Sequence, residues 1–197
     1  MKRPLRCQCG LVQGEVDVHH SARAVCYCKD CQAYARFLGH EAEILDRFGG
    51  TEIIATVPRR VRFNAGFDKV VCMSLSEKGL LRWYASCCRT PIGNTPRDRK
   101  IAYVGLARQC LVGSDDEMRR WFGTREIALN TQSAHGQVRS TPAAMFVGLL
   151  KIIRNVAGAR LKGDYKDNPF FVQDSGMPIT TPQNLTPAER QALDAGR

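Results

Sequence analysis

The sequence lacks the short motifs that assign the commonest enzyme classes at sight. It contains no glycine-rich phosphate loop, no nucleophile elbow and no His-Glu-x-x-His motif, which are typical of nucleotide-binding enzymes, α/β-hydrolases and zinc peptidases respectively. It has no internal repeat and no low-complexity segment, so neither a solenoid nor a disordered chain is expected. Its four histidines have no second ligand at a recognised spacing, and we expect them at the surface.

Long apolar runs are also missing. No uninterrupted stretch approaches the roughly 18 apolar residues of a membrane-spanning helix, and the basic N-terminal residues are not followed by an apolar segment of signal-peptide length. The 197 residues are 44% hydrophobic and 24% charged, which is ordinary for a globular protein. We therefore expect a cytoplasmic protein without a membrane partner, made of one domain or of one domain with an appendage.

Acidic residues are scarce relative to basic ones, and the imbalance is local. The net charge is +10, and residues 51–100 carry ten Lys and Arg against four Asp and Glu, with clusters at 59–62 and 97–100. No run of six like charges exists, and no basic stretch is interleaved with aromatic residues in the way that favours stacking of single-stranded bases. The excess is compatible with a solvated surface, with attraction of an anionic small molecule or with nucleic-acid binding.

The pattern of apolar residues predicts a mainly β protein with a C-terminal helical extension, α+β overall. Short apolar or alternating runs separated by Gly, Pro and Asn indicate compact antiparallel sheets, which we expect to be zinc-bound for the reasons given below. The predicted organisation is a zinc-binding β domain over 1–105, a helical extension over 106–167, and an extended arm with a short helix over 168–197.

Three helices are predicted in the second half of the chain. Ser114 or Asp115 caps a helix that reaches Phe122, and Thr186 with Glu189 forms a capping box. The longest helix covers 142–161 after a Thr141 cap, with Pro142 at its first position. It carries an apolar stripe at helical spacing, which consists of Phe146, Leu149, Leu150, Ile153, Val156 and Ala157. We expect this stripe to cover the sheet or to form a homodimer; a membrane-surface helix is the alternative, because Lys151, Arg154, Arg160 and Lys162 are basic.

Cysteine is the residue type that carries the chemistry. The chain has nine cysteines, an odd number that argues against a disulfide framework in a reducing compartment. Cys72 and Cys110 stand alone in apolar runs and are expected to be buried hydrophobic residues. The other seven form three sequence groups: Cys7 with Cys9, Cys26 with Cys28 and Cys31, and Cys87 with Cys88.

These groups predict metal sites. Zinc prefers four tetrahedral ligands, and thiolate sulfurs are suited to it. The Cys-x-Cys-x-x-Cys group brings three thiolates from one short loop and leaves a fourth position open, as a catalytic zinc requires, whereas a closed four-cysteine site is structural. Cys7 and Cys9 need further ligands, which Cys87 and Cys88 supply if a turn brings both to one ion. We expect two zinc ions per chain; one closed site, or reduced thiols without metal, are the alternatives.

The order of these groups resembles a known family. Cys7-x-Cys9-Gly10, Cys26-x-Cys28-x-x-Cys31 and Cys88-x-Thr90-Pro91, with glycines between them, are similar to the glutathione-dependent formaldehyde-activating enzymes and their relative centromere protein V. The resemblance covers about residues 5–105. It implies a β fold with a structural zinc on Cys7, Cys9 and Cys88 and a second, catalytic zinc on the Cys26, Cys28 and Cys31 trio, where a thiol such as glutathione binds.

The sequence departs from this family at Ala85. The family usually has Cys-x-x-Cys-Gly where this chain has Ala85-Ser-Cys87-Cys88-Arg89. Either Cys87 replaces the missing structural ligand through a shifted turn, or it serves elsewhere, for example as the fourth ligand of the second zinc, which would close the open position. The sequence does not decide between them.

Two functions follow from these patterns. The first is a zinc-dependent carbon–sulfur lyase-like enzyme acting on a thiol adduct of a small carbonyl compound, with a small anionic thiol-containing substrate attracted by Lys29 or by the arginines at 59–62. The alternative is a non-catalytic, zinc-stabilised module that binds nucleic acid or a protein partner. An open three-cysteine site favours the enzyme, and the basic excess favours the binding module.

Overall fold

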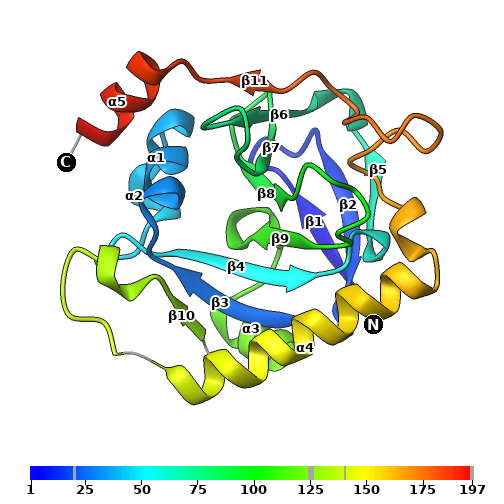
Figure 1. The fold of residues 1–197 in the computed structure, drawn as a ribbon, viewed down its shortest axis with the longest axis horizontal. Helices are drawn as coiled ribbons and strands as arrows, with labels where there is room; N and C mark the ends of the chain where they lie inside the picture. The colour runs from blue at the N-terminus through cyan, green and yellow to red at the C-terminus, as the bar shows by residue number, and fades with distance from the viewer. Residues whose placement is uncertain (20, 124–126, 140, 196–197) are drawn as a thin grey trace.

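Two β-sheets form the centre of the molecule in the computed structural model, which describes residues 1–19, 21–123, 127–139 and 141–195 (Figure 1). The smaller sheet has the order β1-β2-β5 and is antiparallel. The larger has the order β10-β3-β4-β9-β8-β7-β6-β11. The strands are β1 (Lys2–Arg6), β2 (Gln13–Asp17), β3 (Ala22–Cys26), β4 (Thr51–Thr56), β5 (Val61–Ala65), β6 (Val70–Ser74), β7 (Leu81–Ala85), β8 (Pro91–Thr95), β9 (Val104–Ala107), β10 (Ile127–Leu129) and β11 (Gln183–Asn184).

The predicted fold class is confirmed: the protein is mainly β with a C-terminal helical part, and α+β overall. The expectation of purely antiparallel sheets needs one correction. β10 pairs with β3, and β11 with β6, in the parallel sense. Both edge strands come from the C-terminal half of the chain, which returns to the sheet after long connections, so their direction is not set by a hairpin.

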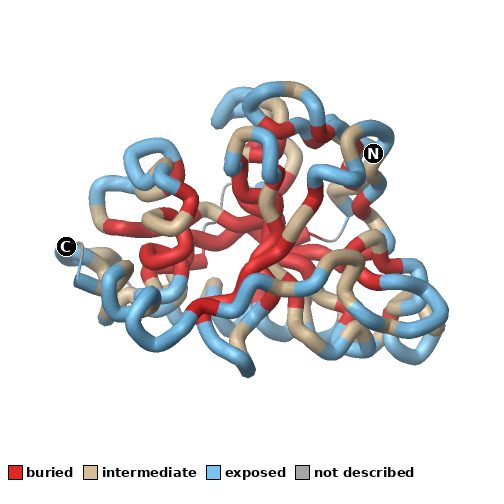
Figure 2. The backbone as a smooth tube through the Cα atoms, turned by 90° about the horizontal axis from the view of Figure 1, so that it is seen from above, coloured by how far each residue is buried: buried red, intermediate tan, exposed pale blue. Residues whose placement is uncertain are grey.

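The main core lies between the two sheets. Leu5, Val16 and Val61 come from the smaller sheet and pack with residues of the larger one, among them Trp83. The Trp83 side chain is fully buried and its indole Nε1 donates to Thr95 Oγ1 at 2.9 Å, which satisfies its one polar atom. Figure 2 shows this buried region running through the middle of the molecule.

The C-terminal segments contribute to the same core. Phe170 is fully buried with its ring 5.1 Å from that of Trp83, and Met118 belongs to the same cluster. Residues from the predicted helical extension (106–167) and from the predicted arm (168–197) therefore pack in the same core as the β-rich part. The domain boundaries near 105 and 167 stay predictions.

In the described part of the chain, the α-helices that surround the sheets are α1 (Lys29–Leu38), α2 (Glu41–Ile44), α3 (Asp115–Phe122), α4 (Pro142–Leu161) and α5 (Pro187–Ala195). The helix start capped by Ser114 is confirmed, and the structure adds a capping box there between Ser114 and Glu117. Thr186 and Glu189 exchange the predicted hydrogen bonds ahead of α5. The sequence analysis missed α1, because it placed all three cysteines of the second group in a loop.

α4 has the predicted limits but a different orientation. Pro142 occupies the first position, whereas Thr141 Oγ1 accepts a hydrogen bond from the Ala128 backbone N–H at 3.0 Å instead of capping the helix. Of the two partners predicted for the apolar stripe, the sheet is not the one, because Phe146 and Ile153 are 63% and 53% exposed. Contact of the stripe with a second copy of the chain stays a prediction. The helix instead approaches the sheet through Gly148, where a Cβ would collide with Ile127.

The turn between β7 and β8 contains a residue in an unfavourable backbone conformation. Arg89 has φ 56°, and its N–H donates to the Ala85 carbonyl at 2.7 Å. Its guanidinium group lies 5.0 Å from the centre of the Phe37 ring and donates to the Phe37 carbonyl. A left-handed conformation costs a side-chain-bearing residue about 1–2 kcal/mol, whereas glycine adopts it freely.

We predict that Arg89→Gly is more stable than Arg89→Ala by about 1 kcal/mol, because both lose the Phe37 contacts but only glycine relieves the left-handed strain. Urea unfolding of the two variants measures the difference. Equal stabilities would mean that the turn relaxes to another conformation.

Candidate metal centres

Four cysteines from two distant turns form the first cluster. The Sγ atoms of Cys7, Cys9, Cys87 and Cys88 lie within 4.8 Å of one another. Cys87 Sγ is 3.3 Å from Cys9 Sγ and 3.9 Å from Cys7 Sγ. The structure places Cys87 in the first cluster, with Cys7, Cys9 and Cys88, and not in the group formed by Cys26, Cys28 and Cys31. That Cys87 replaces a metal ligand at the position of Ala85 stays a prediction.

The backbone conformation of two turns brings these four cysteines together. After β1 the chain turns so that the Gly10 N–H donates to the Cys7 carbonyl at 3.0 Å, with Gly10 at φ 81°. In the second turn, the N–H groups of Cys88 and Arg89 both point to the Ala85 carbonyl. Adjacent cysteines in a straight strand would point to opposite faces, and the turn is what directs both Cys87 and Cys88 to one cluster.

A threonine orients one of these sulfurs. Thr90 Oγ1 accepts a hydrogen bond from the Gln8 N–H at 2.9 Å, which leaves its proton to donate to Cys88 Sγ at 3.1 Å. Burial acts to raise the pKa of Cys88, but hydrogen bonds from Thr90 and from the Cys9 backbone outweigh it and lower the pKa to about 6. Burial raises the pKa of Cys7 and of Cys87, and neighbouring sulfurs add to the effect. Four crowded sulfurs that resist ionising together are a donor set that a soft cation would neutralise.

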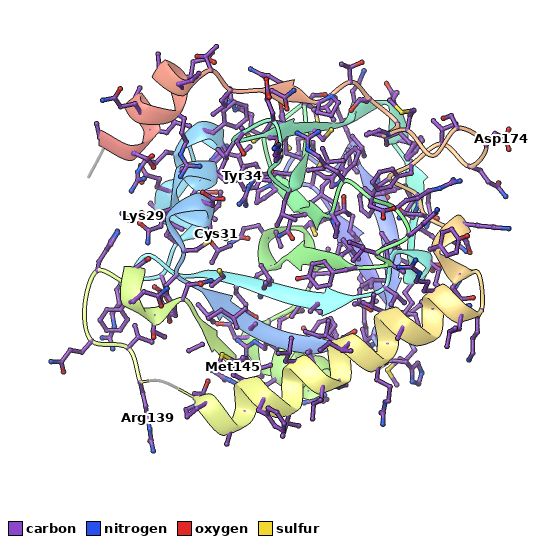
Figure 3. The ribbon with its side chains drawn as sticks, viewed as in Figure 1. Lys29, Cys31, Tyr34, Arg139, Met145 and Asp174 are labelled. Atoms are coloured by element: carbon purple, nitrogen blue, oxygen red, sulfur yellow. The ribbon has the colours of Figure 1, made fainter. Side chains whose placement is uncertain are left out.

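Three cysteines at the junction of β3 and α1 form the second cluster. Cys26 ends β3, Cys28 is the N-cap of α1, and Cys31 lies in its first turn with its N–H 3.4 Å from Cys28 Sγ. Their sulfurs also lie within 4.8 Å of one another. Among the residues that the structure describes, no fourth Cys, His, Asp or Glu joins this group. Figure 3 shows Cys31 and Tyr34 on the side of α1 that faces the sheets, with Lys29 on the opposite side.

Charge is unevenly distributed within this cluster. Hydrogen bonds from the Cys28 and Cys31 thiols, together with one from the Cys28 backbone and the Asn130 side chain, lower the pKa of Cys26 far below its ordinary value. The same contacts with Cys26 raise the pKa of Cys28 and of Cys31. One negative charge is thus shared by three sulfurs at a helix N-terminus, where the helix dipole also favours it. Ionising all three requires a cation at their centre.

A segment far along the chain covers this cluster. Asn130, which follows β10, donates from Nδ2 to Cys26 Sγ at 3.3 Å. Gln32 of α1 donates to the Tyr27 and Ser133 carbonyls at 2.9 Å, and its Oε1 lies 2.9 Å from His135 Nε2. The region beyond residue 105 therefore supplies part of the surroundings of the second cluster.

Arg82 of β7 and Tyr103, the residue before β9, interact electrostatically with the second cluster. The positive charge of Arg82 lowers the pKa of Cys31, although burial and the other sulfurs raise it overall. The Arg82 side chain is 5% exposed and lies 3.7 Å from Asp30. Burial, and then the negative charges of Cys26 and Cys31, raise the pKa of Tyr103. The sequence analysis missed Arg82, Tyr103, Thr90 and Asn130, because each reaches its cluster from another strand or loop and no local pattern marks it.

Comparison with known proteins assigns the chain to a family but does not assign it an activity. The chain matches, over residues 1–181, the model of a family of unknown function, DUF6151. The protein belongs to this family. The match extends well beyond the 5–105 region of the sequence resemblance. No curated protein and no solved structure matches the chain.

Both clusters are compatible with metal binding, and their donor sets differ in a way that bears on function. The first offers four sulfurs, which complete a tetrahedron, and the second offers three. The two lone cysteines were correctly expected inside: Cys72 and Cys110 are buried.

We predict that the purified protein binds two metal ions per chain, that Cys87→Ser and Cys28→Ser each lose one, and that Cys72→Ala keeps both. Cys87→Ser should also lower the unfolding midpoint more than Cys28→Ser, because the first cluster joins two turns that are distant in sequence. Elemental analysis of metal per chain and thermal unfolding measure these effects. Retention of both ions by Cys87→Ser would contradict the assignment of Cys87 to the first cluster.

Thr90→Val should weaken metal binding at the first cluster by about 10–100-fold, since it removes the hydroxyl that orients and stabilises Cys88 as a thiolate. Thr90→Ser retains the hydroxyl and should bind nearly as the natural protein does. Competition with a chromophoric zinc chelator measures both affinities, and equal losses in the two variants would assign the effect to packing of the threonine methyl group.

Proposed function

We propose that the protein is a zinc-dependent carbon–sulfur lyase-like enzyme that acts on a thiol adduct, of the glutathione type, of a small carbonyl compound. The observation that carries the proposal is the contrast between the two clusters: four cysteines in one and, among the described residues, three in the other. A four-cysteine zinc is structural, while a zinc with three protein ligands has a position for substrate. The resemblance to the glutathione-dependent formaldehyde-activating enzymes supports the same division.

Cys26, Cys28 and Cys31 would hold the zinc. When bound, zinc supplies a coordination position for a substrate sulfur and favours the thiolate over the thiol. In the direction of release, the carbon–sulfur bond of the adduct breaks with its electron pair going to sulfur, while the hydroxyl oxygen gives its proton to a solvent water and becomes a carbonyl oxygen. The reverse direction adds a thiolate to a carbonyl compound.

Two polar side chains suit the oxygen of such an adduct, and one of them, Tyr103, lies close enough to Cys26 and Cys31 for their charges to add to the effect of burial and raise its pKa. Residues directly opposite in neighbouring strands share a face of the sheet, and Gly105 of β9 is paired with Asn94 of β8. A Cβ at Gly105 would lie 2.8 Å from the Tyr103 hydroxyl oxygen and 3.2 Å from the Asn94 amide. The lack of a side chain there leaves the hydroxyl and the amide facing the same small space, and we assign them to hold the adduct oxygen by hydrogen bonds.

The charges around the cluster suit an anionic substrate. Three thiolates on a divalent zinc leave a net charge of −1, which repels an anion unless cations offset it. Arg82 acts on Cys31 from within the protein, and Lys29 is exposed at the start of α1, next to Cys28. Arg82 thus compensates the cluster itself, and Lys29 is available to attract substrate carboxylates.

The alternative of a nucleic-acid-binding module gains no support from the basic clusters. Arg59 and Arg62 pair with Asp164 and Asp167, and Arg97 donates to Asn184 Oδ1. These arginines attach the C-terminal segments to the β-rich part, so a large share of the basic excess at 51–100 has an intramolecular role.

Titration of glutathione into cobalt-substituted protein tests the proposal. We expect the thiolate-to-cobalt absorption of one of two bound ions to change, the response to vanish in Cys28→Ser, and Cys72→Ala to respond as the natural protein does. Turnover of the glutathione adduct of formaldehyde, followed as its decay, should fall more than about tenfold in Cys28→Ser. If glutathione changes the absorption of neither bound ion, the lyase proposal is wrong, and the non-catalytic binding module is favoured.

A further inference from the structure

The outer face of α4 is apolar along its length. Phe146, Leu150, Ile153 and Ala157 stand at helical spacing and are all exposed, with Phe146 63% and Leu161 at the end of the helix 89% exposed. The opposite face is held to the sheet by Gly148 and by Ile152, and Lys151 Nζ donates to the Ser21 carbonyl at 2.6 Å. Figure 1 shows α4 running along one side of the molecule with no element on its outer side.

Cationic side chains accompany this apolar face. By helical spacing Arg154 and Arg160 lie on its two flanks, and both are exposed. From residue 127 to residue 163 the sequence contains no Asp or Glu. A pocket of about 340 Å³ lies beside the C-terminal half of α4, between this helix and the 3₁₀ turn Pro58–Arg60. One carboxylate, that of Asp164, and four cationic side chains line it: Arg59, Arg60, Arg154 and Lys162.

We propose that α4 is a membrane-surface helix that docks the protein on a bilayer containing anionic lipid. The apolar face would enter the boundary between headgroups and acyl chains, the flanking arginines would lie at headgroup level, and the cationic pocket would take a lipid phosphate. The charge of the helix decides between this occupant and a second copy of the chain. Two copies of α4 packed face to face would bring together arginines with no carboxylate on either helix, whereas an anionic surface complements them.

The proposal has the helix lie on the membrane, not cross it. α4 is the helix of the described chain that is long and apolar enough to span a bilayer by length and composition, with 11% of its apolar window buried. Its inner face, however, packs on β3 and β10 through Gly148 and Ile152. Crossing the membrane would require these contacts to break, while surface docking keeps them.

Sedimentation of the full-length protein with vesicles tests this inference. We expect binding to vesicles of phosphatidylcholine with 30 mol % phosphatidylglycerol, weaker binding as salt is raised, and at least tenfold weaker binding to phosphatidylcholine alone. Washing at high pH should release the bound protein, and resistance to this wash would overturn surface docking in favour of insertion.

Matched variants separate the apolar and the electrostatic parts. Phe146→Ser with Ile153→Ser should reduce vesicle binding at least tenfold, whereas Phe67→Ser with Met177→Ser changes two exposed apolar residues elsewhere and should not. Arg154→Glu with Arg160→Glu should abolish the preference for anionic lipid, and Lys78→Glu with Lys100→Glu, which makes the same change in net charge, should leave most of it. Circular dichroism checks that each variant is folded.

Three results would overturn the proposal. One is equal vesicle binding by the α4 variants and their controls. Another is a dimer in light scattering that dissociates in Phe146→Ser, with no vesicle binding by the natural protein. The third is saturation of the cationic pocket by inorganic phosphate at micromolar concentration without any affinity for vesicles, which would make the pocket a site for a free anion.

Discussion

The four-sulfur contact between the turn after β1 and the turn between β7 and β8 is the constraint on which the structure depends. It fastens the edge of the smaller sheet to the centre of the larger one across about 80 residues of sequence separation. Without a cation, burial and the neighbouring sulfurs raise the pKa of Cys7 and of Cys87, so the four cysteines do not all ionise together. A bound metal ion would stabilise the thiolates, and the folding of the two-sheet core would then be coupled to metal binding.

The second cluster depends on different physics, which explains why it can remain open. Its three sulfurs come from six consecutive residues at a strand end and a helix start, so no long loop has to close to assemble them. Its stabilising contacts are hydrogen bonds from Asn130 and the charge of Arg82, which orient and compensate the sulfurs without occupying a ligand position. In the proposed function, the first cluster therefore stabilises the fold, and the second cluster is the one available to bind a substrate.

Sequence reasoning succeeded where the information is local and failed where it is not. The N-cap at Ser114, the capping box at Thr186, the limits of α4 and the grouping of Cys26, Cys28 and Cys31 all depend on residues within a few positions of one another. The role of Cys87 required the φ of Arg89, which the sequence does not reveal, and Asn130 reaches Cys26 only because β10 joins β3 in parallel. The sequence left open whether the stripe on α4 covers the sheet or another molecule, because helical periodicity identifies a face but not its partner. The small residues Gly148 and Ala159 are the ones that approach the rest of the protein.

The position of β10 connects the two surfaces to which functions are assigned. Its first residue, Ile127, packs against Gly148 of α4, and the Ala128 N–H is held by Thr141 just before that helix. The strand then ends at Leu129, so that the next residue, Asn130, contacts Cys26. One short strand therefore lies between the outer helix and the open thiol cluster, and its register against β3 fixes both distances at once. A shift of one residue in that register would turn Ile127 away from α4 and move the Asn130 amide off the sulfur, which is why the C-terminal half of the chain is a working part of the second cluster and not an appendage to it.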